Sequence, residues 1–197
     1  MVQLKRETKE TKIKLELDLY GTGEYDIKTG IGFFDHMLKL WSRHGFFDLT
    51  LKVDGDLEID PHHTVEDTGI LLGQALSQAL GDRSGIKRYG DVVLPMDETL
   101  VMVALDLSGR SYYEDDLKFF RSKVGEFPVE LFAEFFRSLS SNANLNLHFK
   151  ILRNGNTHHL LEGCWKGFAR ALDQALQPEK RLGETPLSTK GSLGEGE

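Results

Sequence analysis

Alternating apolar and polar residues divide the first half of the chain into elements. The alternation predicts strands, and apolar residues at three- and four-residue spacing predict helices. The Gly21-Thr22-Gly23 turn is predicted to join the first two strands in a hairpin, and Gly81 to end the last helix. In order, the first half predicts strand, strand, helix, strand and helix over residues 12–20, 24–28, 33–43, 46–53 and 62–80.

The second half predicts the same order of elements and repeats short stretches of the first. A shift of 88 positions matches Glu10-Thr11 with Glu98-Thr99, and a shift of 96 matches His62-His63 with His158-His159. The change of shift implies about eight extra residues in the second half, which the polar stretch 113–127 would supply. The matched stretches together indicate a tandem duplication. The predicted elements are strands over 91–95, 100–107 and 144–152, and helices over 128–139 and 158–176.

These elements predict an α+β fold of duplicated halves. Each half would be a two-layer α/β sandwich, with helices packed on one face of a sheet. We expect the halves to span 1–90 and 91–177 and to work as one functional unit. The polar remainder, 178–197, is expected to be a flexible tail.

Composition narrows the class of protein. The 197 residues are 40% hydrophobic, enough for a packed core, and the net charge of −7 argues against nucleic acid or a membrane surface as partner. Cys164 is the single cysteine and falls in an apolar helical stripe, which indicates packing rather than nucleophilic chemistry. The chain lacks an apolar run of the roughly 20 residues that a membrane span needs. We therefore expect a cytoplasmic protein.

Histidines carry the strongest chemical signal, because they are paired and in register with the repeat. His62-His63 is followed by Glu66, and His158-His159 by Glu162 at the same spacing. On a helix, the first histidine and the glutamate lie about 40° apart, while the second histidine points about 100° away. One segment can therefore face two metal ions.

Two further histidines extend this set. His148 lies in the last strand of the second half, where the shift of 96 places Lys52 in the first half, and His36 lies in the first helix, opposite Phe132. Six imidazoles and two carboxylates shared between two ions give four ligands each and leave about two positions open, as in a catalytic site. Imidazole and carboxylate without thiolate suit Mn, Fe, Co or Zn, and octahedral openness favours Mn.

A phosphate site is indicated separately. Arg88 and Arg110 each lie close to glycine in a predicted turn, where a guanidinium group can bind phosphate in bidentate fashion. Ser188 and Lys190 add a hydroxyl and an ammonium group in the tail. With a metal centre, these residues predict a small phosphorylated substrate.

Taken together, the motifs resemble the imidazoleglycerol-phosphate dehydratase family over roughly residues 4 to 192. The resemblance rests on blocks in the family's order. They are Gly30-Ile31-Gly32-Phe33-Phe34-Asp35-His36-Met37-Leu38, Asp60-Pro61-His62-His63-Thr64-Val65-Glu66-Asp67, Gly85-Ile86-Lys87-Arg88-Tyr89-Gly90, Pro95-Met96-Asp97-Glu98, His158-His159 with Glu162, and Ser188-Thr189-Lys190-Gly191.

The resemblance implies dehydration of imidazole glycerol phosphate to imidazole acetol phosphate in histidine biosynthesis, at a centre of two Mn²⁺ per active site. It also implies a fold similar to the second domain of ribosomal protein S5, and assemblies of 24 subunits with active sites between neighbours. The implied metal ligands are His36, His62, His63, Glu66, His148, His158, His159 and Glu162. The implied substrate contacts are Glu10, Arg88, Arg110, Lys166, Ser188 and Lys190.

Acid and base roles fall on carboxylates near these ligands. Glu10, Glu66 and Glu162 are the candidates, and Asp97 is a weaker one. A di-metal hydrolase acting on a small phosphorylated substrate is the alternative enzyme, and release of inorganic phosphate would support it. A non-catalytic RNA- or metal-binding module is a third reading, which the net charge and the two arginines disfavour.

Overall fold

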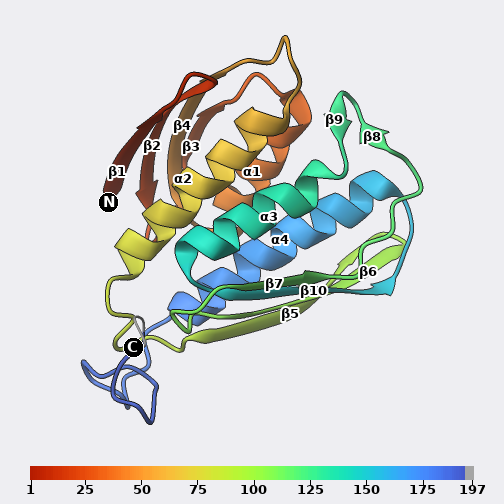
Figure 1. Ribbon diagram of the computed structural model, residues 1–197. Coiled ribbons are helices and arrows are strands. Elements are labelled where there is room, and N and C mark those ends of the chain that lie inside the picture. Colours follow the sequence, from red (N-terminus) through yellow and green to blue (C-terminus); the bar gives the residue numbers. More distant parts are fainter. Residues whose placement is uncertain (194–197) are drawn as a thin grey trace.

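The computed structural model describes residues 1–193 and consists of two sheets with helices between them. Figure 1 shows the first sheet on one side, the helices in the middle and the second sheet on the other side. Each sheet pairs with two helices from its own half, and the two helical layers then pack on each other. The duplicated α+β fold predicted from the sequence is confirmed.

In the first half, three strands precede the first helix. The spatial order of the sheet is β1-β2-β4-β3, with β3 parallel to β4 and the other neighbours antiparallel. The bounds are β1 Val2–Glu7, β2 Thr11–Asp18, β3 Tyr25–Lys28, α1 Gly32–Gly45, β4 Asp48–Gly55 and α2 His62–Leu80.

The second half repeats this order and adds a short ribbon before its first helix. Its sheet has the order β5-β6-β10-β7, the same topology as the first. The bounds are β5 Tyr89–Met96, β6 Thr99–Asp106, β7 Tyr112–Asp115, β8 Lys123–Val124, β9 Phe127–Pro128, α3 Leu131–Ala143, β10 Asn146–Arg153 and α4 Thr157–Leu176.

The two halves share one hydrophobic core. Strand β2 buries Ile13, Leu15 and Leu17 on its inner face and exposes the residues between them, as its alternation predicts. Between the halves, α2 lies so close to α3 that a Cβ added at Gly69 or Gly73 would come within 2.7 or 2.6 Å of a backbone carbonyl oxygen of α3. The helical layers therefore join the halves into a single packed unit.

The short ribbon strands β8 and β9 were not predicted from the sequence, and neither were two strands of the large sheets, β1 and β7. Both lie at sheet edges and are half-exposed, so their apolar signal is weak. The predicted hairpin through Gly21-Thr22-Gly23 is wrong, because β2 pairs with β1 and β4 while β3 pairs only with β4. Asp48 explains the path of the loop, since its Oδ1 accepts the N–H groups of Thr22, Gly23 and Glu24 at 2.8, 2.9 and 2.9 Å.

Asp48→Asn should therefore destabilise the protein at neutral pH. The hydrogen bond from the Glu24 N–H, then those from Thr22 and Gly23, hold the pKa of Asp48 below its ordinary value of 3.8 despite the opposing effect of burial. A lowered pKa adds stability that is complete above the ordinary value and is lost as the pH falls through the folded value. We expect a loss of about 1 kcal/mol at pH 7 because charged hydrogen bonds are replaced by neutral ones. Urea unfolding at pH 7 and pH 3 checks this, with exposed Asp91→Asn as control; an undiminished difference at pH 3 would contradict it.

Residues 178–193 contact residues 85–88, which connect α2 to β5. The Glu179 N–H donates to the Gly85 carbonyl at 2.8 Å, and the Gly85 N–H donates to that of Thr185 at 3.1 Å. The expected flexibility of the tail stays a prediction, and its part at 194–197 lies outside the described residues. Among residues 1–193, no helix combines the length and apolar character needed to cross a membrane.

Candidate metal centre and phosphate pocket

One cluster of predicted ligands forms where α1 crosses the start of α4. The Nε2 atoms of His36 and His158 lie 3.5 and 3.1 Å from Oε2 of Glu162, close enough for the three to share one cation. His36 belongs to the first half and the other two to the second. Packing of the helical layers, rather than proximity in sequence, therefore assembles this cluster.

The start of α4 fixes the position of the adjacent histidines His158 and His159. Asn156 caps α4, and its side-chain oxygen accepts the His158 N–H at 2.8 Å, which sets the start of the helix. Glu162 follows one turn later and is only 7% exposed. Burial raises its pKa, but the hydrogen bond from Lys166, 2.5 Å away, and the His158 contact bring the pKa below its ordinary value. The carboxylate is thus held in its charged form, as a metal ligand must be.

A second cluster involves the other histidine of the same pair. His159 lies between two acidic residues of the β5–β6 turn, with Nδ1 3.0 Å from Glu98 Oε2 and Nε2 3.8 Å from Asp97 Oδ2. Asp97 is the first residue of this two-residue turn and has a left-handed φ of 50°. This places Asp97, predicted as a weaker acid or base, at the exposed edge of the histidine.

The histidine pair of the first half has similar surroundings at the start of α2. His62 Nε2 lies 3.7 Å from Glu66 Oε2, four residues later. His63 Nδ1 lies 2.9 Å from Asp56 Oδ2, and its Nε2 lies 3.8 Å from Glu10 Oε1. Glu10, a predicted substrate contact and acid or base, is therefore a neighbour of the histidine pair.

Within residues 1–193, the eight predicted ligands do not form one centre. Three of them share the cluster at α1 and α4, His159 lies beside the β5–β6 turn, and His62, His63 and Glu66 lie at the start of α2. His148 lies on the outer face of β10, where its ring stacks on Tyr112 with centroids 5.3 Å apart. Each set leaves an exposed side to which a further ligand could be added.

The structure corrects the repeat counterparts of two predicted ligands. His148 pairs with Ala104, and 88 positions earlier Glu16 pairs with Thr50, so Thr50 rather than Lys52 corresponds to His148. Helices α1 and α3 end at left-handed residues 98 positions apart, which makes Glu134 rather than Phe132 the counterpart of His36. The shift of 96 fails there because the loop before α2 is longer than the loop before α4.

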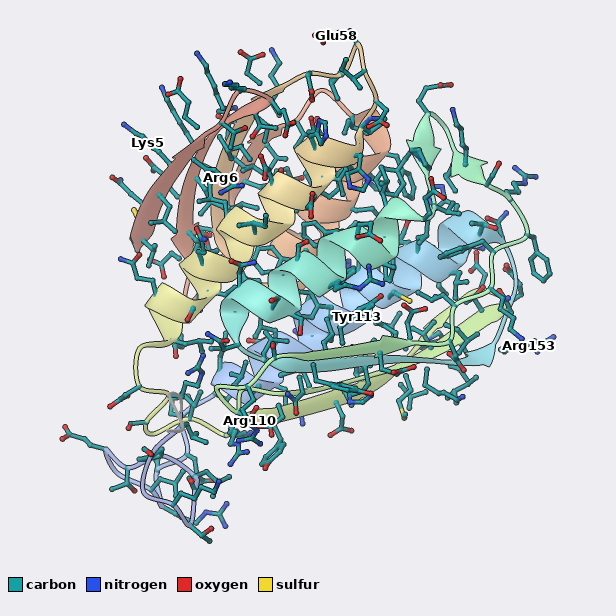
Figure 2. All side chains as sticks on the ribbon, in the orientation of Figure 1. Lys5, Arg6, Glu58, Arg110, Tyr113 and Arg153 are labelled. Atoms are coloured by element: carbon teal, nitrogen blue, oxygen red, sulfur yellow. The ribbon has the colours of Figure 1, made fainter. Side chains whose placement is uncertain are left out.

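Four predicted substrate contacts line one cavity of about 840 Å³ at the other end of the second sheet. Figure 2 shows Arg110 at this end and Arg153, which precedes α4, at the opposite end. The four residues are Arg88, Arg110, Ser188 and Lys190. Together they form a basic pocket that is large enough for a phosphate group and the atoms next to it.

Arg88 also has a structural role that was not predicted from the sequence. Its Nε and Nη2 donate to the two oxygens of Asp106 at 2.7 and 2.9 Å, and its Nη1 donates to the Leu187 carbonyl at 2.6 Å. These bonds tie the tail to the second sheet. Arg110 and Lys190 are left as the exposed basic groups of the pocket.

The pocket and the cluster lie at opposite ends of α4. The Arg88 N–H donates to the Ala175 carbonyl near the end of the helix, whereas His158 lies in its first turn. Seventeen residues at 1.5 Å each separate these positions by about 26 Å. Lys166 differs from the other predicted substrate contacts of the second half, because it lies beside the Glu162 cluster.

Two carboxylates of the site were not assigned a role from the sequence. Asp56 and Glu98 contact the Nδ1 atoms of His63 and His159. Asp56 lies in an irregular turn that has no periodic signal. Glu98 has two signals in the sequence, as the repeat counterpart of Glu10 and as the end of the block Pro95-Met96-Asp97-Glu98, but neither indicates a contact with a histidine.

The fold and the two sites define a duplicated α+β enzyme with imidazole–carboxylate clusters and a separate basic pocket. The family model described as imidazoleglycerol-phosphate dehydratase matches residues 29–172. Relatives of that name from Desulforamulus reducens and Acetivibrio thermocellus are 53% and 52% identical over 191 residues, covering 97% of this chain and 97% of each relative.

Solved structures agree. The crystal structure of the dehydratase from Staphylococcus aureus has a TM-score of 0.80 at 39% identity, covering 90% of this chain and 98% of that one. The structure from Pyrococcus furiosus, in complex with (S)-C348, has a TM-score of 0.82 at 34% identity, covering 96% and 100%. The chain belongs to the imidazoleglycerol-phosphate dehydratase family and is a hydro-lyase.

Proposed function

We propose that this enzyme dehydrates imidazole glycerol phosphate to imidazole acetol phosphate in histidine biosynthesis, with two Mn²⁺ per active site. The observation that carries the metal dependence is the convergence of His36, His158 and Glu162 from different halves of the chain. A cytoplasmic location stays a prediction from the sequence.

The donor set fits the metal. Glu162 is buried and charged, and the imidazole nitrogens of His36 and His158 converge on one of its oxygens. Imidazole and carboxylate without thiolate suit Mn²⁺. Bound metal would lower the pKa of the substrate's imidazole ring, which matters because the carbon that loses its proton has no adjacent carbonyl group.

Residues of this chain would handle the proton transfers. Glu162 contacts Lys166 and two histidines. This environment suits a metal ligand better than a catalytic base. Glu10 and Asp97 lie 3.8 Å from Nε2 of His63 and His159 on exposed sides of the two halves. We propose them, with Glu66, as the groups that remove the carbon proton or protonate the departing hydroxyl group.

The phosphate would bind in the basic pocket with Arg110, Ser188 and Lys190, beside Arg88. An imidazole, three carbons and a phosphate span about 10 Å at ordinary bond lengths, much less than the separation along α4. One chain therefore cannot bind the ring at its own cluster and the phosphate in its own pocket. This supports a homo-oligomer with shared active sites, and the family resemblance suggests 24 subunits.

A steady-state assay of chelator-treated protein, with and without added Mn²⁺, tests the proposal. Ketone and free phosphate are followed together. We expect ketone only with Mn²⁺ and no phosphate release. Phosphate without ketone would favour the di-metal hydrolase, and ketone at full rate without metal would contradict the metal centre.

Lys190→Ala should weaken substrate binding without changing the metal content. Lys190 lines the basic pocket, so the substitution removes binding energy far from the reacting atoms. We expect KM to rise by about tenfold or more, the loss of one charged hydrogen bond. Kinetics and bound Mn²⁺ are measured on the same preparation. Unchanged KM would remove the tail from the site.

A further inference from the structure

In each half, the second histidine of the pair has a carboxylate at Nδ1. His63 Nδ1 lies 2.9 Å from Asp56 and His159 Nδ1 lies 3.0 Å from Glu98. A charged carboxylate only accepts hydrogen bonds, so in each contact the histidine nitrogen carries the proton and donates it. In the neutral ring, the opposite nitrogen, Nε2, then carries the free lone pair.

We propose that Glu98 and Asp56 are positioning residues, which hold the rings of His159 and His63 so that Nε2 of each can bind a metal ion. This rests on the proposed metal-dependent function and adds two residues to it. A carboxylate at the ring nitrogen that does not bind the metal fixes the orientation of the ring, and it increases the basicity of the nitrogen that does bind.

Glu98 is better placed for this role than for binding the metal itself. Its Oε1 accepts the Asn156 N–H at 2.5 Å, and both oxygens lie within 3.3 Å of His159 Nδ1. The tight β5–β6 turn fixes its backbone between Met96 and Thr99. Glu98 therefore links the turn, the start of α4 and the histidine ring.

The repeat shows that the duplicated glutamates have separated in role. Glu10 and Glu98 are counterparts at the shift of 88, yet Glu10 lies on the Nε2 side of its histidine and Glu98 on the Nδ1 side. In the first half Asp56, from the loop after β4, occupies the Nδ1 side instead. Nδ1 of each histidine thus contacts a carboxylate, although the two carboxylates come from loops that are not repeat counterparts. This indicates that the carboxylate is needed at Nδ1 and is not simply left over from the duplication.

Gly155 provides a way to move Glu98 without removing its charge. A Cβ at this position would come 2.4 Å from Glu98 Oε1 and 2.5 Å from its Cγ. Gly155 has no left-handed backbone angle, so alanine is tolerated by the backbone itself. Gly155→Ala should displace Glu98 and, through it, His159.

The experiment is a Mn²⁺ titration of the metal-free full-length protein, with free Mn²⁺ measured by electron paramagnetic resonance. Glu98→Ala should weaken the sites that use His159 by about 10- to 100-fold. Gly155→Ala should change affinity in the same direction, and the double variant should be no weaker than Glu98→Ala. Glu98→Gln, which keeps an acceptor for Asn156, should give an intermediate affinity. Glu16→Ala, an exposed carboxylate on the outer face of the first sheet, is the control.

The Mn²⁺ titration distinguishes failure of the metal centre from failure of the positioning role. If folded wild-type protein binds no Mn²⁺, the proposed metal centre fails. If the wild type binds Mn²⁺ and folded Glu98→Ala and Glu98→Gln bind it with wild-type affinity, the positioning role is overturned while the metal centre stands. Additive losses in the Gly155→Ala/Glu98→Ala double variant would also overturn it, because the glycine would then act by another route.

Discussion

Glu162→Gln is expected to lower kcat by at least about 10³-fold and to remove Mn²⁺ from the cluster, because a neutral amide replaces the carboxylate on which two imidazoles converge. The substitution keeps the size of the side chain and an oxygen that can accept from Lys166. The loss should therefore come from the charge and not from a cavity.

Stability and activity can be separated at this site. Removing the charge of Glu162 leaves Lys166, which is only 17% exposed, without its ion pair, and we expect the free energy of unfolding to fall by about 1–3 kcal/mol. Adding Lys166→Met should recover stability but not Mn²⁺ binding. Urea unfolding, metal content and kinetics are measured on wild type, both variants and the Glu16→Ala control. If Glu162→Gln alone retains its Mn²⁺ and its kcat, the proposed metal centre is contradicted.

Two inactive variants are expected to regain activity when mixed. Arg110→Ala damages the basic pocket and His158→Ala damages the cluster, and the two sites lie at opposite ends of α4 in one chain. If each active site takes its cluster from one chain and its pocket from a neighbour, random 1:1 assemblies contain about one quarter of intact sites.

Coexpression, or unfolding and refolding of the mixture, allows the subunits to exchange. We expect about 25% of wild-type activity from the mixture and almost none from either variant alone. A double variant, Arg110→Ala/His158→Ala, mixed with His158→Ala serves as control and should stay inactive, because no chain in that mixture has an intact cluster. Absence of recovery in assemblies shown by mass spectrometry to contain both chains would contradict shared active sites.

The halves and most of their elements could be predicted from the sequence because their signals are local. Alternation in β2 and the helical spacing around Trp41 follow directly from which side chains face the core. The paired histidines were recognisable for the same reason, since a fixed spacing repeated on a helix survives duplication. Edge strands β1 and β7 bury too little of their surface to give such a signal.

Pairing between strands and contacts between helices were decided by the tertiary structure. The turn at Gly23 has the composition of a hairpin, but the three N–H groups bound by Asp48, 24 residues or more away in sequence, direct the chain to the far side of β4. Likewise, the repeat counterpart of His148 depends on sheet register, which a fixed shift of the sequence cannot follow across loops of unequal length.

The sequence by itself determined the duplication, the residue types of both sites and the family, because these depend on composition and spacing along the chain. Only the tertiary structure decided that His36 joins His158 and Glu162, that Glu98 and Asp56 contact the Nδ1 atoms of His159 and His63, and that the basic pocket lies far from the cluster. The physical reason is that such contacts depend on how helices and sheets pack. Packing brings His36 to His158 although they are distant in sequence. The length of α4 keeps the cluster at its start apart from the basic pocket near its end.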